Sequence, residues 1–188
     1  MFEVAKVATM WIAVLCAILS WKVGIDALLS QESGIIPRNE EGKYEYKEVV
    51  RLPDLSADAI YKRALQWVHR EYKNPKQTLQ LQDAANHRLM LRHQIRVPRI
   101  RKSGSPWLFV HYKLSIEVKD GRYRYRVFKL HLKNGNRFYP IERWTDKNEL
   151  PPKEAQTYLA YVDREVRSLL ERMKKYIADP PVEKSDDW

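Results

Sequence analysis

Hydrophobic and polar residues alternate most clearly in residues 107–132, which read WLFVHYKLSIEVKDGRYRYRVFKLHL. Two runs with a period of two meet at Asp120-Gly121, and this spacing predicts a β-hairpin with a two-residue loop. The dipeptide favours a type I′ turn, because both central residues of that turn must adopt positive φ. The loop pairs Lys119 with Arg122, so one face of the hairpin is apolar and aromatic and the other is charged.

This register predicts the neighbours on each face of the hairpin. The apolar pairs are Val118 with Tyr123, Ile116 with Tyr125, and Leu114 with Val127. On the charged face, Glu117 lies opposite Arg124.

Strict alternation fails at the far end of the hairpin, since it would put Phe128, Leu130 and Leu132 on the charged face. A β-bulge near Val127-Phe128 inserts one residue and returns Leu130 and Leu132 to the core. The bulge also sets His111 opposite His131.

Apolar spacing of three and four residues predicts two helices. The first spans about 57–73, begins after an N-cap at Ser56 and ends at Asn74-Pro75. The second follows Pro151-Pro152, and its apolar stripe indicates a helix that packs on a sheet. The stripe consists of Ala155, Tyr158, Leu159, Val162, Val166, Leu169, Leu170, Met173 and Ile177.

The remaining strands are predicted at 43–51, 78–81 and 87–97, with some strand character at 137–144. Together these elements predict an α+β fold: an antiparallel sheet of about five or six strands with two helices on one face. The domain is predicted to span 43–178, after a linker at 31–42 and before a disordered tail at 179–188.

Residues 7–21 form an apolar run between Lys6 and Lys22. The run is shorter than the roughly 20 residues of a membrane span, so we predict a signal peptide over residues 1–30. An N-terminal membrane anchor or a buried apolar helix stays open, because Glu3 offsets Lys6 and no A-x-A cleavage pattern is present. We expect an extracytoplasmic location, periplasmic or anchored in the inner membrane, with membrane contact only through 7–21 if this segment is uncleaved.

Composition adds a strong basic excess, with 34 Lys and Arg against 24 Asp and Glu and a net charge of +10. Such a charge suits nucleic acid, anionic lipid or anionic polysaccharide, and it is also a common solubility feature. The only cysteine is Cys16, which excludes an intramolecular disulfide, a thiolate metal cluster and a cysteine nucleophile in the folded domain.

Three segments together resemble a known family: YKRALQWV from Tyr61, QLQDAANHRLML from Gln80, and IEVKDGRYRY from Ile116. They are similar to a bacterial domain of unknown function with a TBP-like fold, domain of unknown function 4468. The resemblance implies an antiparallel sheet with helices on one face, often in exported proteins, and it supplies no catalytic residue. The turn at 83–86 departs from the family pattern because it lacks a glycine.

Catalytic motifs are missing from the sequence: there is no glycine-rich phosphate loop, nucleophile elbow or HExxH helix. His111 and His131 are too few for a zinc site, which needs three or four protein ligands. We therefore expect no enzymatic activity, no cofactor and no metal.

The basic ladder of the hairpin is the candidate anion-binding site. It consists of Lys113, Lys119, Arg122, Arg124 and Arg126. Arg99, Arg101 and Lys102 extend it in a loop at 98–106 that we predict to be mobile. A solvated polar face accounts for the same alternation. No exposed aromatic residues for base stacking are expected on this face, which weakens the case for single-stranded nucleic acid.

Two functions follow as hypotheses. The first is a non-catalytic, extracytoplasmic binding or scaffold module for an unknown ligand or protein partner. The alternative is a polyanion-binding protein that holds nucleic acid or an anionic glycan on its arginine-rich sheet face.

Overall fold

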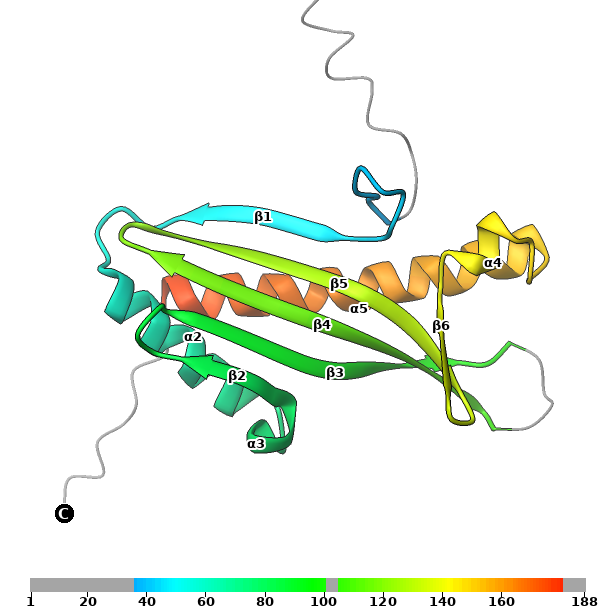
Figure 1. Cartoon of the computed structure of the whole chain (residues 1–188), viewed down its shortest axis with the longest axis horizontal. Coiled ribbons are helices and arrows are strands. Elements are labelled where there is room, and N and C mark those ends of the chain that lie inside the picture. Colours follow the sequence, from blue (N-terminus) through cyan, green and yellow to red (C-terminus); the bar gives the residue numbers. More distant parts are fainter. Residues whose placement is uncertain (1–35, 101–104, 181–188) are drawn as a thin grey trace, which may run out of the picture. The chain divides into compact units, whose positions relative to one another are not determined.

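The strands of the computed structural model, which describes residues 36–100 and 105–180, form a six-stranded antiparallel sheet (Figure 1). The strands are β1 (Tyr46–Arg51), β2 (Leu79–Asp83), β3 (Arg88–Pro98), β4 (Trp107–Lys119), β5 (Arg122–Asn134) and β6 (Arg137–Pro140). The helices are α2 (Ala57–Glu71), α3 (Pro75–Thr78), α4 (Arg143–Asp146) and α5 (Pro152–Ala178). The strand order is β1-β5-β4-β3-β2, and β6 pairs with the end of β5. The predicted α+β fold is confirmed.

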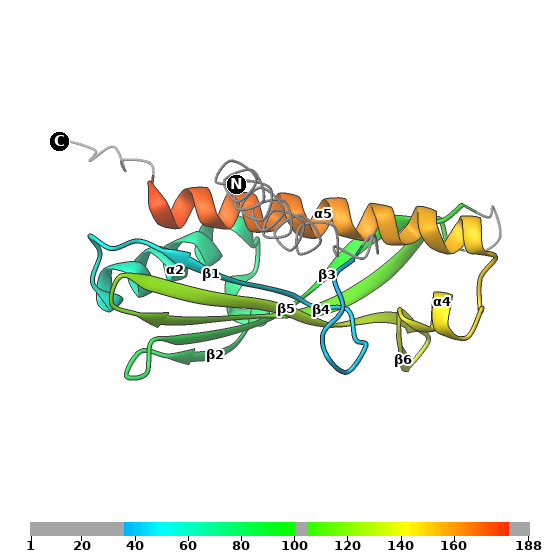
Figure 2. The same ribbon diagram turned by 90° about the horizontal axis from the view of Figure 1, so that it is seen from above.

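The two long helices, α2 and α5, lie on one face of the sheet (Figure 2). Trp67 of α2 and Met173 of α5 are buried in the same core as Ile116 from the sheet. Burial of each such side chain stabilises the fold by about 1.5–3 kcal/mol. We call the opposite side of the sheet, which faces the viewer in Figure 1, the open face.

The apolar stripe of the last helix is confirmed in full. All nine predicted positions of α5, from Ala155 to Ile177, are buried. The helix begins at Pro152, where proline is tolerated because the first N–H groups of a helix have no intrahelical partner. At α2 the predicted cap is also present, since Ser56 Oγ accepts a hydrogen bond from the Ala59 N–H at 3.2 Å.

The hairpin register is confirmed, but the predicted type I′ turn is wrong. Lys119 pairs with Arg122 and Glu117 with Arg124, as expected. Gly121 has φ of +68°, whereas Asp120 is not among the residues with positive φ. A type I′ turn needs positive φ at both positions, and positive φ at the second alone is the pattern of a type II turn.

The turn is held by the segment that connects β1 to α2. Asp120 Oδ1 accepts a hydrogen bond from the Ala57 N–H at 2.7 Å. The Gly121 N–H donates to the Leu55 carbonyl at 2.9 Å, and the Leu52 N–H donates to the Gly121 carbonyl at 2.8 Å. These contacts come from residues distant in sequence, so local turn preference does not decide the conformation.

A bulge restores the core pattern in β5, as predicted, but it lies just beyond Phe128. Lys113 pairs with Phe128, and the next aligned pair is His111 with His131. Lys129 takes the extra position with φ of +54°. Leu130 is buried as a result, whereas Phe128 keeps its place on the open face.

The turn between β2 and β3 is built without the glycine of the family pattern. His87 has φ of +49° and ends this turn. Its ring nitrogen Nε2 lies 2.7 Å from Asp58 Oδ1 at the start of α2. The Asp83 carboxylate also accepts a hydrogen bond from the Asn86 backbone N–H at 3.1 Å.

Ordered packing starts earlier than the predicted domain boundary at residue 43. Ile36 is buried in the core, although it lies in the predicted linker 31–42. Arg38 forms an ion pair with Asp146 of α4 at 2.7 Å. The domain described here therefore includes part of that segment.

Several predictions concern residues that the structure does not describe. These are the leader at 1–30 with its apolar run 7–21, the basic residues Arg101 and Lys102, and the tail from 181 to 188. Of the helices in 36–100 and 105–180, none has the length and apolar character to cross a membrane.

Candidate functional site

The open face is defined by the alternate side chains of each strand that point away from α2 and α5. Its basic members are Lys47, Arg51, Arg88, Arg92, Arg96, Lys113, Lys119, Arg122, Arg124, Arg126 and Lys133. Its carboxylates, among the described residues, are Glu45, Asp83 and Glu117. The basic side chains clearly outnumber the acidic ones, so this side of the sheet carries a positive field.

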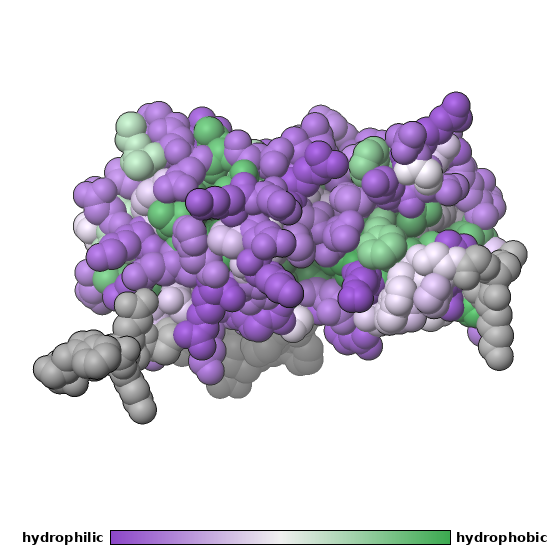
Figure 3. All heavy atoms as spheres, turned by 90° about the horizontal axis from the view of Figure 1, so that it is seen from below, coloured by the Kyte–Doolittle hydropathy of each residue, from purple (hydrophilic) through white to green (hydrophobic). Residues whose placement is uncertain are grey.

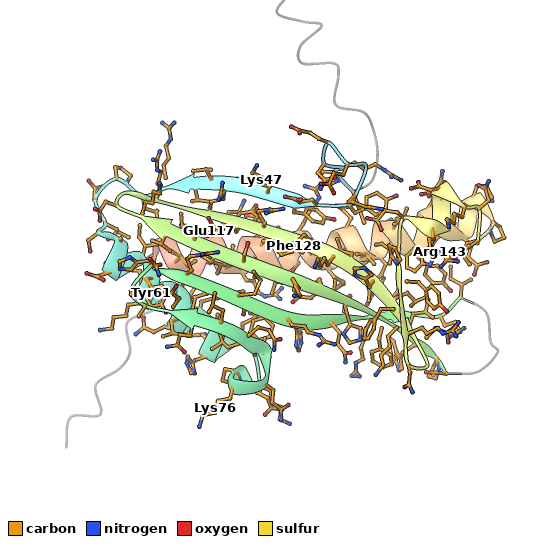
Figure 4. All side chains as sticks on the ribbon, in the orientation of Figure 1. Lys47, Tyr61, Lys76, Glu117, Phe128 and Arg143 are labelled. Carbon is orange, nitrogen blue, oxygen red and sulfur yellow. The ribbon has the colours of Figure 1, made fainter. Side chains whose placement is uncertain are left out.

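All five predicted anion-site residues lie on the open face, and three of them meet at one place. Lys119, Arg122 and Arg124 line a hollow of about 530 Å³ near the hairpin turn. Arg88 of β3 and Glu117 of β4 line the same hollow. Lys113 and Arg126 lie farther along β4 and β5, beside Phe128. Figure 4 labels Phe128 together with Glu117, which lies nearer the hairpin turn.

Two of the five predicted residues are neutralised by neighbouring carboxylates. An Arg124 nitrogen lies 2.6 Å from Glu117 Oε2, and Arg126 Nε lies 2.7 Å from Glu45 Oε1. Glu45 is 8% exposed, and the Arg126 guanidinium holds the pKa of this carboxyl below its usual value. Arg126 therefore stabilises the contact between β5 and the residues that precede β1.

The other three predicted residues, Lys113, Lys119 and Arg122, make no ion pair within the described part of the chain. Lys119 and Arg122 are exposed, and Lys113 is half-buried. Their charge is thus available to an anion without the loss of an existing contact.

Sequence reasoning missed the contribution of β3 to this face. Arg88, Arg92 and Arg96 recur every fourth residue and pair with Glu117, Lys113 and Phe109 of β4. The alternation of side chains within 88–98 already placed these three arginines on one face of a strand. The strand order, which places β3 beside β4, had to be known before the arginines could be added to the ladder.

The expectation that no exposed aromatic residues lie on this face is wrong. Trp107, Phe109, Phe128 and Phe138 all occupy open-face positions. Phe128 remains there because the bulge comes after it. Phe138 lies on β6, and this strand is too short for its alternation to be recognised in the sequence.

Arginine side chains lie over three of these rings, in the geometry of cation–π contacts. The guanidinium carbon of Arg126 is 5.1 Å from the centre of the Phe128 ring. Arg92 is 5.7 Å from Phe138, and Arg96 is 5.5 Å from Trp107. The open face thus combines cations and flat apolar rings.

Exposed apolar side chains are concentrated on the same face. Val49, Leu81, Trp107 and Phe138 are between 39% and 51% exposed, and each lies at an open-face position of its strand. The side of the molecule seen in Figure 3 is mainly hydrophilic, with separate hydrophobic patches. Exposed rings inside a basic surface indicate a contact surface more strongly than scattered ones do.

The predicted histidine pair is present. His111 lies opposite His131, and its ring meets Phe138 edge-on at 5.1 Å. Burial, with Arg92 and Lys133 nearby, lowers the pKa of His111. No group of three metal-ligating side chains occurs in 36–100 or 105–180. The contact with Phe138 gives His111 a role in packing.

A second hollow, of about 420 Å³, lies between the open face and the segment before β1. It is lined by Glu142, Glu45 and His131, among others. Glu142 Oε1 accepts a hydrogen bond from the Tyr44 N–H at 2.8 Å, which gives this buried carboxylate a structural role.

The comparison with family models finds a match within the sheet of this chain. The model for a domain of unknown function with a TBP-like fold, DUF4468, matches residues 46–133. Residues 46–133 are a DUF4468 domain. The matched segment runs from β1 almost to the end of β5 and so contains the five strands that form the continuous sheet of this DUF4468 domain.

Two solved structures resemble the whole fold. A DUF4468 family protein from Bacteroides ovatus ATCC 8483 aligns with a TM-score of 0.61 and 14% identity, over 80% of this chain and 95% of that one. A TBP-like protein from Parabacteroides distasonis ATCC 8503 aligns with a TM-score of 0.56 and 11% identity, over 76% and 99%. Identities this low establish the fold alone. None of the curated proteins matches the sequence.

Proposed function

We propose that this domain is a non-catalytic binding module whose open face binds an anionic polymer. The observation that supports the proposal is the set of unpaired cations on that face, chiefly Lys113, Lys119 and Arg122. An anion that contacts them gains electrostatic attraction and releases counterions, and it breaks no ion pair of the protein.

The predicted leader extends this proposal to location. An exported or anchored module would meet its polymer outside the cytoplasm. Recovery of the full-length protein in the cytosolic fraction would remove this part of the proposal and leave the binding face untouched.

Retention of the full chain on immobilised heparin, an anionic polymer, tests the binding face. We expect a Lys113→Gln, Lys119→Gln, Arg122→Gln variant to elute at clearly lower salt than the wild type, because three contacts with the polymer are lost. The variant leaves both open-face ion pairs intact, so its fold is not at risk.

The matched control removes the same charge elsewhere. Lys62 of α2, Lys76 of α3 and Lys175 of α5 are exposed and lie outside the open face. Their replacement by Gln is expected to leave most of the retention in place. Equal loss in both variants would mean that net charge, and not the open face, governs retention.

A further inference from the structure

We infer that the polymer bound by the open face is a single-stranded nucleic acid, whose bases stack on the exposed rings while its phosphates meet the unpaired cations. This inference rests on the proposed function, because it names the ligand class of the same face. It concerns the chemistry of the polymer and is independent of the compartment in which the protein acts.

The arrangement of the side chains carries the inference. Each of three rings has a basic neighbour directly across the ladder: Phe128 faces Lys113, Phe138 faces Lys133, and Phe109 faces Arg96. Facing side chains in an antiparallel pair have Cβ atoms about 4.5–5.5 Å apart. A nucleotide presents the same combination of a charged phosphate and a flat apolar base.

The rings distinguish this ligand from other polyanions. A highly charged glycan such as heparin is held mainly through its charges and has no bases to stack on the rings. In duplex DNA the base faces are stacked on each other, so rings reach them only by wedging between base steps. Only a single strand offers free base faces together with a charged backbone.

The length of the face suits several nucleotides. β4 and β5 have 13 residues each. At about 3.3 Å per residue they extend about 40 Å. Single-strand-binding modules with aromatic platforms take about 4–16 nucleotides. Phe138 lies toward one end of this strip, Phe128 lies at its middle, and the hollow beside Arg122 lies at the other end.

The test compares a fluorescently labelled twelve-residue oligothymidine, the same sequence as a duplex, and heparin, each titrated with the full chain. Phe138→Leu is the first variant, because Phe138 is 44% exposed and its loss leaves the core intact. We expect its affinity for the single strand to fall about tenfold, in line with the loss of one stacked base, and its affinity for heparin to stay within about twofold.

Tyr176→Leu of α5 provides a matched control. Its ring lies 5.7 Å from the Arg70 guanidinium, the same distance as between Phe138 and Arg92, but it belongs to the helix layer. We expect unchanged single-strand affinity. A second variant, Phe128→Leu, checks the result at an independent ring.

The outcomes separate the two claims. Heparin binding with no loss of single-strand affinity in either phenylalanine variant would overturn the inference and leave the proposed function standing. Duplex binding as tight as single-strand binding would also overturn the inference. Failure to bind any of the three polymers would overturn both.

Discussion

Arg126 illustrates how one side chain of the ladder can differ from its neighbours. Its guanidinium donates from Nε to Glu45 Oε1 at 2.7 Å and from a terminal nitrogen to Oε2 at 3.1 Å. The partner is nearly buried, whereas Arg122, two positions along the same face, makes no ion pair in the described chain. The alternating pattern of β5 alone assigns both residues to the same charged face and does not distinguish them.

Arg126→Gln is therefore expected to lower the free energy of unfolding by about 1–3 kcal/mol, because it leaves the Glu45 carboxylate buried without its cation. Arg122→Gln is the control and is expected to change it by less than about 0.5 kcal/mol. Urea unfolding of both variants checks this. Equal free energies of unfolding for the two variants would show that the ion pair with Glu45 adds nothing to stability.

We predict that His111 and His93 make the free energy of unfolding depend on pH. Burial lowers the pKa of both, and Arg92 and Lys133 add to the effect at His111. A histidine whose pKa is lower in the folded state binds protons more readily when unfolded. Its stability contribution is therefore complete above the unfolded value of about 6.5 and is lost as the pH falls below it.

We expect NMR titration to place the midpoint of His111 below 6.5, and His111→Gln to reduce the loss of stability between about pH 7 and pH 5. A midpoint at or above the ordinary value would contradict the burial of this ring.

The hairpin turn is an element whose conformation depends on a distant segment, residues 52–57. Gly121 has φ of +68°, and a Cβ atom added there would lie 3.4 Å from Pro53 Cα. Gly135, in the turn between β5 and β6, has φ of +57° and open space around the same position.

Replacement of either glycine by alanine is expected to lower the free energy of unfolding by about 1 kcal/mol, because an alanine at positive φ is strained. Gly121→Ala should lose more than Gly135→Ala, since its methyl group also meets Pro53. Thermal unfolding of the pair measures the difference. A greater loss for Gly135→Ala would argue against close contact at the hairpin turn.

At this scale the sequence allowed the prediction of strands, helices and hairpin register, because those depend on periodic burial against a single core. The turn type was wrong because Asp120 is held by the Ala57 N–H, which no local pattern reveals. The aromatic part of the candidate site was missed for a similar reason: β6 brings Phe138 across a turn to the side of β5. Pairings between short or distant segments are the part that periodicity does not encode.

In the whole molecule, the positive charge is distributed unequally between the two layers. On α5, four basic residues are engaged by carboxylates: Arg164 by Glu165, Arg167 by Asp163, Arg172 by Glu71 and Lys174 by Glu171. On the open face, Lys113, Lys119 and Arg122 are not engaged within the described residues. The net charge of +10 could be read from the sequence, but the row of basic side chains that β3, β4 and β5 form on one face required the structure.

The salt dependence of heparin binding tests the central claim, that these unpaired open-face cations hold an anionic polymer. The Kd of the full chain is measured at several salt concentrations for the wild type, for the Lys113, Lys119, Arg122 variant and for the Lys62, Lys76, Lys175 variant. We predict that the slope of log Kd against log salt decreases by on the order of two to three in the open-face variant only. The reason is that each lost contact between the protein and the polymer releases one counterion fewer. Identical slopes for the wild type and the open-face variant would contradict the account.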